Sequence, residues 1–282
     1  MKKLLNIIIS IVLLAPMMLI FTACENEGIV LTVGQNGNYQ TLSEAVNAVE
    51  ANNELYTIKL LENLNGSGFV VKENQNIVFN FNGNTYLMDG ATVGSAGTET
   101  NGFQLLKGSN VVFKNGTMKQ SGAKILIQNY SNLTIDNFTI DARSNSQTIC
   151  SYALSNNFGN IMIKNQSNIY AYNGQVAFDL WYGMSSSYDQ GVNVKFDNSF
   201  SGTVQGKIEY GAANRATTGW ESKTKLEIEN GTFNIGAIDL TKYTENANIS
   251  IKGGSFDIDV TGCVANGYKC TLKNNRYIVE KA

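Results

Sequence analysis

Carboxylates are the residues of this sequence whose types and spacing suit chemistry, because the 282-residue chain contains no histidine. Without imidazole, no Ser-His-Asp or Cys-His catalytic unit and no histidine-ligated metal site can form. Four short segments share one pattern of apolar and polar residues: SYAL (151–154), FDL (178–180), IEY (208–210) and IDL (238–240). If they are neighbouring parallel strands in register, a serine is followed by Asp179, Glu209 and Asp239 at intervals of about 5 Å.

Such a column of carboxylates has three interpretations. Carboxylates on adjacent strands match the spacing of a retaining glycosidase, and Asp179 and Asp239 match the wider spacing of an inverting one, so that Asp179, Glu209 and Asp239 with Arg215 would form the catalytic set of a polysaccharide hydrolase or lyase. The same oxygens suit a weak Ca²⁺ site, which is the only cofactor that the sequence suggests. Alternatively, differences in loop length separate the three side chains, and they form a solvated acidic stripe.

Aromatic residues gather beside this column in two long loops rich in Gly and Ser. The chain has two tryptophans, and both fall there. Flat aromatic rings beside carboxylates and an arginine suit sugar rings, which stack through their apolar faces. The candidate ligand-binding residues are Trp181, Tyr182, Tyr210, Arg215 and Trp220. The alternative is that these aromatics fold back and cover the side of the fold.

The N-terminus has the features of an export signal. Lys2 and Lys3 precede an apolar run from Leu4 to Phe21, and small residues lead to Cys24. The ending Phe-Thr-Ala-Cys resembles the bacterial lipobox, which implies cleavage before Cys24 and lipid attachment to its sulfur. Two or more acyl chains hold a protein on a bilayer, whereas one gives marginal binding. The alternative is an ordinary cleaved signal with Cys24 as an incidental thiol.

These boundaries divide the chain into a signal peptide (1–23), a polar tether (24–30) and one domain (31–282). We therefore expect an exported protein that a lipid at Cys24 anchors to a membrane, facing the cell surface or the periplasm. Without Lys2 and Lys3, 19 of the 21 basic residues remain against 23 acidic ones, a net charge of −4. This balance gives no electrostatic reason to expect nucleic acid as a partner.

Three thiols remain in the predicted domain, Cys150, Cys263 and Cys270, which is an odd number for an exported protein. Cys263 and Cys270 flank a tight segment and could close a small disulfide loop. The alternative is that all three are reduced and act as small hydrophobic side chains.

A repeat positions all of these residues. Six segments share the order Asn, apolar, variable, apolar, charged, Asn or Gly: NVVFKN (110–115), NLTIDN (132–137), NIMIKN (160–165), NVKFDN (193–198), KLEIEN (225–230) and NISIKG (248–253). A strand that recurs once per unit with loops of variable length is typical of a solenoid. Period-2 alternation predicts that both apolar residues of each segment face one continuous core.

Stacking the segments in parallel predicts two further columns. The Asn that ends each segment, from Asn115 to Asn230, suits a left-handed turn, and stacked amides can hydrogen-bond along the stack. The charged position alternates in sign for most neighbours, which stabilises adjacent strands. Its residues are Lys114, Asp136, Lys164, Asp197, Glu229 and Lys252.

The two ends of a stack of strands must be covered. Thr41-Leu42-Ser43-Glu44 is a capping box, and an apolar stripe follows it, so we expect a helix to about Ala51 that acts as a lid. The run NYQTLSEAVNAV, TIKLL and NIVFNFNG resembles the entrance of pectin-lyase-like right-handed parallel β-helices, and GGSFDIDVTGCVANGYKC with NRYIV resembles their last turn and end cap. The resemblance implies an all-β fold, a single-stranded right-handed β-helix with a short N-terminal capping helix.

The catalytic sequence elements of two enzyme branches of that superfamily are absent from this chain. Polygalacturonase-like enzymes have a Gly-His-Gly element, and this chain has no His. Pectate-lyase-like enzymes have an Arg-x-Pro-x-x-Arg element, and the only proline here is Pro16. The sequence therefore favours a non-catalytic surface protein that binds glycan or contacts the envelope or a host through the face near Trp181 and Trp220. The alternatives are the polysaccharide hydrolase or lyase described above and a structural spacer.

Overall fold

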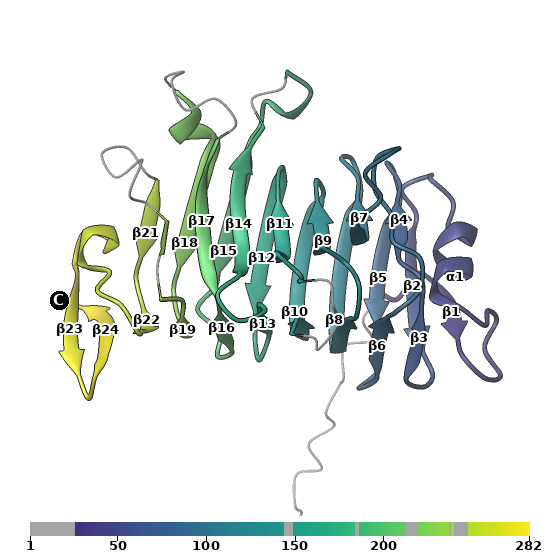
Figure 1. Cartoon of the computed structure of the whole chain (residues 1–282), viewed down its shortest axis with the longest axis horizontal. Helices are drawn as coiled ribbons and strands as arrows, with labels where there is room; N and C mark the ends of the chain where they lie inside the picture. The colour runs from purple at the N-terminus through teal and green to yellow at the C-terminus, as the bar shows by residue number, and fades with distance from the viewer. Residues whose placement is uncertain (1–25, 144–148, 184–185, 213–218, 237, 240–247) are drawn as a thin grey trace, which may run out of the picture.

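The computed structural model describes residues 26–143, 149–183, 186–212, 219–236, 238–239 and 248–282. Strands dominate and form two sheets, of seventeen strands (sheet A) and seven strands (sheet B), that run side by side along the molecule (Figure 1). The predicted signal peptide (1–23) and Cys24 lie outside the described residues. Within them, no helix is long and apolar enough to cross a membrane.

The chain alternates between the two sheets, and each repeat adds strands to three columns. The first column of sheet A holds β1 (Ile29–Val33), β2 (Leu55–Leu60), β5 (Asn76–Asn80), the first parts of β8 (Asn110–Gln120) and β10 (Asn132–Asp141), β12 (Gly159–Lys164), β15 (Val192–Phe196), β18 (Thr224–Ile228) and β21 (Ile249–Ile251). The second column holds β3 (Leu64–Gly66), β6 (Thr85–Met88), the later parts of β8 and β10, β13 (Asn168–Tyr170), β16 (Thr203–Gln205), β19 (Thr232–Asn234) and β22 (Gly254–Phe256). Sheet B holds β4 (Phe69–Val71), β7 (Asn101–Leu105), β9 (Ile125–Asn129), β11 (Tyr152–Asn156), β14 (Val176–Tyr182), β17 (Lys207–Ala212) and β20 (Ile238–Asp239).

The register of the first column confirms the alignment of the six repeats. Leu133 pairs with Val111 on one side and with Ile161 on the other, and the same offset continues through Val194 and Leu226. The alternating apolar residues of these strands are buried, except Ile249, which is half-buried near the C-terminal end. Parallel strands with one buried face thus build a single continuous core.

The column of asparagines at the strand ends is confirmed only in part. Asn115, Asn137 and Asn165 have φ values of 57°, 49° and 55°, the left-handed conformation that asparagine tolerates. Asn198 and Asn230 do not, and Gly231 takes the positive φ in the later turn. The expected amide ladder does not join the members of this column in the described part of the chain. Asn165 donates to the carboxylate of Asp136, and Asn115 donates to Asn80, which precedes the column.

The charge column is confirmed for two pairs of neighbours with opposite signs, Asp136 with Lys164 and Glu229 with Lys252. Lys164 Nζ lies 3.1 Å from the Asp136 carboxylate. Farther along, Glu229 contacts Lys252 at 3.8 Å, and Lys195 from the adjacent outward row reaches it at 2.8 Å. These half-exposed pairs contribute a few tenths of a kcal/mol each.

A helix covers the N-terminal end, as predicted. In α1 (Leu42–Ala48) the Thr41 side chain accepts from the Glu44 amide, and the Glu44 carboxylate accepts from the Thr41 amide. Leu42, Ala45 and Val46 are buried against the core. The helix ends three residues earlier than expected, where the Gln75 side chain donates to the carbonyls of Val46 and Val49. The first strand begins at Ile29, inside the predicted tether.

An antiparallel hairpin closes the C-terminal end. Its strands are β23 (Tyr268–Lys273) and β24 (Arg276–Lys281), and β24 pairs with β22 in the antiparallel sense. The Arg276 guanidinium bonds to Ser255, Asn234 and the Phe233 carbonyl, which fastens the hairpin to two preceding repeats. Cys263 and Cys270 are both free and half-buried, and Cys150 is free and buried, so these thiols act as small apolar side chains.

Candidate functional site

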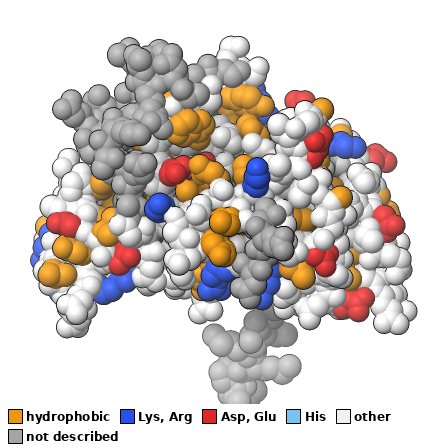
Figure 2. Space-filling view, in the orientation of Figure 1, with side chains coloured by type: hydrophobic (Ala, Val, Ile, Leu, Met, Phe, Trp, Pro, Cys, Tyr) orange, Lys and Arg blue, Asp and Glu red, His pale blue; other side chains and the backbone are white. Residues whose placement is uncertain are grey.

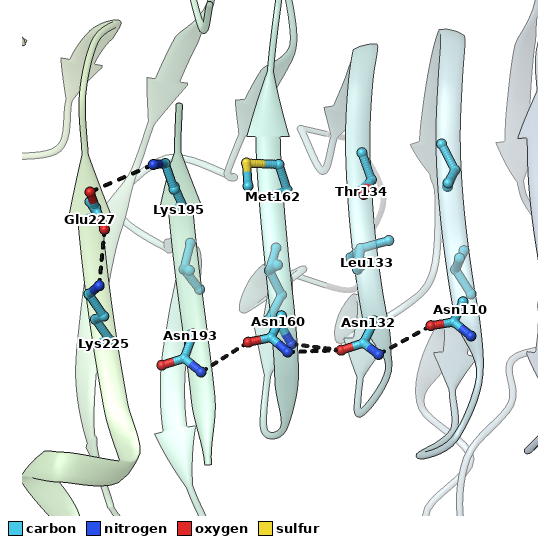
Figure 3. A pocket seen from close by; sticks show the side chains of 14 residues that line it. Asn110, Asn132, Leu133, Thr134, Asn160, Met162, Asn193, Lys195, Lys225 and Glu227 are labelled. Carbon is cyan, nitrogen blue, oxygen red and sulfur yellow. Dashed lines mark hydrogen bonds and ion pairs between the residues drawn. The ribbon is translucent and has the colours of Figure 1, made fainter. Parts of the chain in front are cut away.

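A concave feature lies on the outward face of the first column of sheet A. This groove, which we call the asparagine groove, has a volume of about 600 Å³ and crosses β8, β10, β12, β15 and β18. One side chain per strand forms each of its two rows (Figure 3). The edge row is Asn110, Asn132, Asn160, Asn193 and Lys225, and the floor row is Val112, Thr134, Met162, Lys195 and Glu227.

The four asparagines of the edge row form a directional amide ladder. Asn132 Nδ2 donates to Asn110 Oδ1 at 3.1 Å, Asn160 Nδ2 to Asn132 Oδ1 at 3.2 Å, and Asn193 Nδ2 to Asn160 Oδ1 at 3.0 Å. Every donor therefore points toward the N-terminal end of the stack (Figure 3). Parallel register creates this ladder, because it places the asparagine at or next to the start of each strand beside that of the next strand.

The sequence contained the signal for this ladder. The repeat begins with Asn in four consecutive segments, but the expectation of a ladder was placed on the Asn at the other end of each strand. At that end Asn165 bonds to the Asp136 carboxylate, whereas at the strand starts the amides bond to one another.

A cluster of charges closes the C-terminal end of the groove. Glu227 lies 2.6 Å from Lys252, 3.1 Å from Lys225 and 3.7 Å from Lys195. Lys252, followed by Lys225 and Lys195, lowers the pKa of Glu227 to about 2, against the opposing effect of burial. The carboxylate therefore stays ionised and pairs with the neighbouring lysines at any physiological pH.

The carboxylates of sheet B stand on neighbouring strands as predicted. Asp179 pairs with Glu209, and Glu209 pairs with Asp239. The serine beside Asp179 is Ser155 and not the serine of SYAL, because Leu154 pairs with Phe178. The side chain of Asp239 lies outside what the structure describes.

Asp179 is not a solvated residue but is 4% exposed. Its carboxylate accepts from the Asn156 amide and from the Ser155 hydroxyl, and the Asn156 side chain donates to the Asp179 carbonyl. Burial raises the pKa of Asp179 to about 7, although the bonds from Asn156 and Ser155 lower it. Asp179 therefore joins the end of β11 to β14 and can hold a proton near neutral pH.

Glu209 is half-buried and is held from two strands away. Tyr152, on β11, crosses β14 and donates its hydroxyl to Glu209 Oε2 at 3.0 Å. Burial, and then the nearby Glu209 carboxylate, raise the pKa of Tyr152. Among the described residues, no group of three or more acidic or cysteine side chains has the arrangement of a metal site.

The structure separates the predicted aromatic residues. Tyr210 is a core side chain, since it is 2% exposed and its hydroxyl bonds to Thr224 and the Asn248 amide, so it cannot stack on a ligand. Tyr182 is also buried. Trp181, near the end of β14, is half-buried and is the one predicted aromatic whose described side chain reaches solvent.

The loop after β14 folds back along the molecule. Tyr188 packs on Tyr130 with ring centroids 5.2 Å apart and on Phe158 at 5.4 Å. Lys107 lies over Phe158 and donates to the Ser187 carbonyl. Tyr188 thus covers the side of the fold. Arg215 and the side chain of Trp220 lie outside the described part of the chain.

Comparison with known proteins adds no family. No protein-family model matches the sequence, and no curated protein sequence matches it significantly.

Proposed function

We propose that this chain is a right-handed parallel β-helix of the pectin-lyase-like type, exported and anchored by a lipid at Cys24, that binds an extended glycan without cleaving it. The handedness and the superfamily rest on the sequence resemblance, and three strand columns visited in a fixed order support them. The binding site is the asparagine groove.

The observation that carries this proposal is the pairing of a polar edge with an aliphatic floor over several repeats. The amides recur about every 4.8 Å beside Val112, Thr134 and Met162, which are half-exposed. A sugar chain presents apolar ring faces and hydroxyl edges at regular intervals. Its ring faces can therefore pack on the floor row while its hydroxyls bond to the edge row. A peptide strand repeats its groups at a different spacing, and the groove offers no separate pockets for its side chains.

The groove can be tested by blocking it with one side chain. Thr134→Arg places a long cation on the floor, and we expect it to abolish binding to immobilised polysaccharides. Thr117→Arg is the matched control, because Thr117 also faces outward from sheet A but stands in the second column. Equal loss in both variants, or equal binding in both, would contradict the proposed site.

The lipid anchor has its own test. Mass spectrometry of the mature N-terminus, purified from membranes, should show an acylated Cys24, and an unmodified Cys24 would refute the anchor. A chain that is anchored but binds no glycan would be the structural spacer.

A polysaccharide hydrolase or lyase is the second candidate, and the raised pKa of Asp179 favours it. A carboxyl that titrates near pH 7 can donate and accept a proton in catalysis. Release of shorter products from pectic, host or cell-wall glycans would support this candidate if Asp179→Asn and Glu209→Gln abolished it. Product release that survives both changes would exclude these residues as the catalytic pair.

A further inference from the structure

The hydrogen-bonding capacity of the amide ladder defines what its ligand must offer. Each amide has two N–H donors and an oxygen that accepts two hydrogen bonds. Within the described residues, the ladder uses one donor each of Asn132, Asn160 and Asn193 and none of Asn110. At least one donor per strand therefore remains for a ligand.

Acceptors remain as well. The Asn132 side-chain oxygen accepts hydrogen bonds from both the backbone and the side-chain N–H groups of Asn160, so it has no acceptor capacity left. The oxygens of Asn110 and Asn160 each accept one bond from the ladder, and that of Asn193 accepts none from it. The edge of the groove thus presents donors and acceptors together.

Each lysine at the end of the groove is paired with a glutamate of the protein itself. Lys225 lies 3.1 Å from Glu227, and Lys195 lies 2.8 Å from Glu229. On the side of the molecule opposite the groove, which Figure 2 shows, acidic and basic side chains are also interspersed. A ligand carboxylate in the groove would find no lysine without a glutamate beside it, and it would approach Glu227.

We infer that the ligand of the asparagine groove is an uncharged glycan, recognised through a row of hydroxyl groups. A hydroxyl both donates and accepts, and it can pair with each remaining amide group, whereas a carboxylate or sulfate at the same position only accepts and cannot pair with an amide oxygen. This inference rests on the proposed function and specifies the ligand of the same site. Asn110 and Asn193 are three strand spacings apart, about 14 Å, so a short oligosaccharide fills the edge row.

The experiment is calorimetric titration of the folded, signal-free chain with two sets of hexasaccharides. The neutral set is built from glucose, mannose, galactose or xylose, and the acidic set from glucuronic, galacturonic or mannuronic acid. We expect the tightest ligand to be neutral and its affinity to change less than about twofold between low and high salt, since no net charge is paired on binding. A tighter acidic ligand, or steep weakening with salt, would overturn the inference but leave glycan binding intact. No binding by either set would overturn the proposed function itself.

A substitution tests the edge row directly. Asn160→Asp keeps the shape of the side chain, removes its donors and adds a negative charge, and we expect the affinity for the best neutral hexasaccharide to fall about tenfold. Asn266→Asp is the control, because Asn266 is exposed in the turn before β23 and no described residue bonds to its side chain. Unchanged affinity in Asn160→Asp with an unchanged melting temperature would remove the amides from recognition. If that variant does not fold, the titrations of the unaltered chain still decide between the two classes of ligand.

Discussion

Asp179 is buried beside residues of the adjacent strand β11 that bond to its carboxylate. Alternation places it on the outward side of β14, where a carboxylate is ordinarily solvated. Ser155 and the Asn156 amide instead bind both of its oxygens, and Tyr152 passes over β14 to Glu209. Asp179 therefore holds two strands together, and whether it can donate or accept a proton depends on its protonation state.

The pH dependence of stability should reveal this group. The pKa of Asp179 is about 7 in the folded protein against an ordinary value of 3.8, so the folded state holds the proton more tightly. Its contribution to stability is fully present below about pH 4 and is lost as the pH rises through about 7. We expect Asp179→Asn to gain stability relative to the unaltered chain over this range, as measured by urea unfolding at intervals of pH. A constant difference between the two proteins would show that Asp179 does not titrate there.

The left-handed turn residues give a second expectation for single side chains. Asn137 has a φ of 49°, and its side chain accepts from the Gln166 amide. We expect Asn137→Ala to lower the free energy of unfolding by about 1–2 kcal/mol, because a Cβ without a local hydrogen bond disfavours this backbone. Asn137→Gly should cost less, since glycine adopts positive φ freely. Chemical denaturation of both variants measures the difference, and the opposite order would contradict the strain argument.

Among the elements, the N-terminal helix depends most on local sequence signals. It has seven residues, too few to be stable alone in water, so its capping box and its buried stripe must both contribute. The Gln75 side chain adds two hydrogen bonds at the other end. Thr41 and Glu44 therefore fix the N-terminal end of the helix, and Gln75 fixes its C-terminal end.

Removal of the N-cap should loosen this lid. We expect Thr41→Ala to lower the free energy of unfolding by about 1 kcal/mol, and Thr41→Ser to keep most of it, because either hydroxyl can accept from the Glu44 amide. Hydrogen exchange of the Ala45 and Val46 amides should accelerate in the alanine variant alone. Equal exchange in both variants would mean that packing, and not the cap, holds the helix.

At the scale of the whole molecule, the repeat explains what the sequence could predict. Strands that stack on their sequence neighbours inherit their register from the alignment, so the buried layers and the pairing of Asp179 with Glu209 followed directly. Loop insertions broke the prediction elsewhere, as with the serine beside Asp179. Burial could not be read from alternation alone, because Asp179 faces outward on its strand and is nevertheless only 4% exposed.

The candidate site was less predictable than the fold. The chemistry of Tyr210 and Tyr182 suits a ligand, but both side chains are buried in the core. The asparagine groove is made of residues that are ordinary one by one. Its chemistry arises only from their alignment across strands.

The arrangement of the strands also determines how the protein would respond to force. β1 and the β23–β24 hairpin lie at opposite ends of the molecule (Figure 1), and each repeat is bonded mainly to the repeats before and after it. Tension between the two ends would peel the hydrogen bonds of one strand at a time and not shear many together. In single-molecule pulling we expect successive small events, each releasing one repeat of 22–33 residues or roughly 70–120 Å of chain, and one all-or-none event would contradict this. A protein built in this way dissipates a pull gradually while most of its surface stays intact.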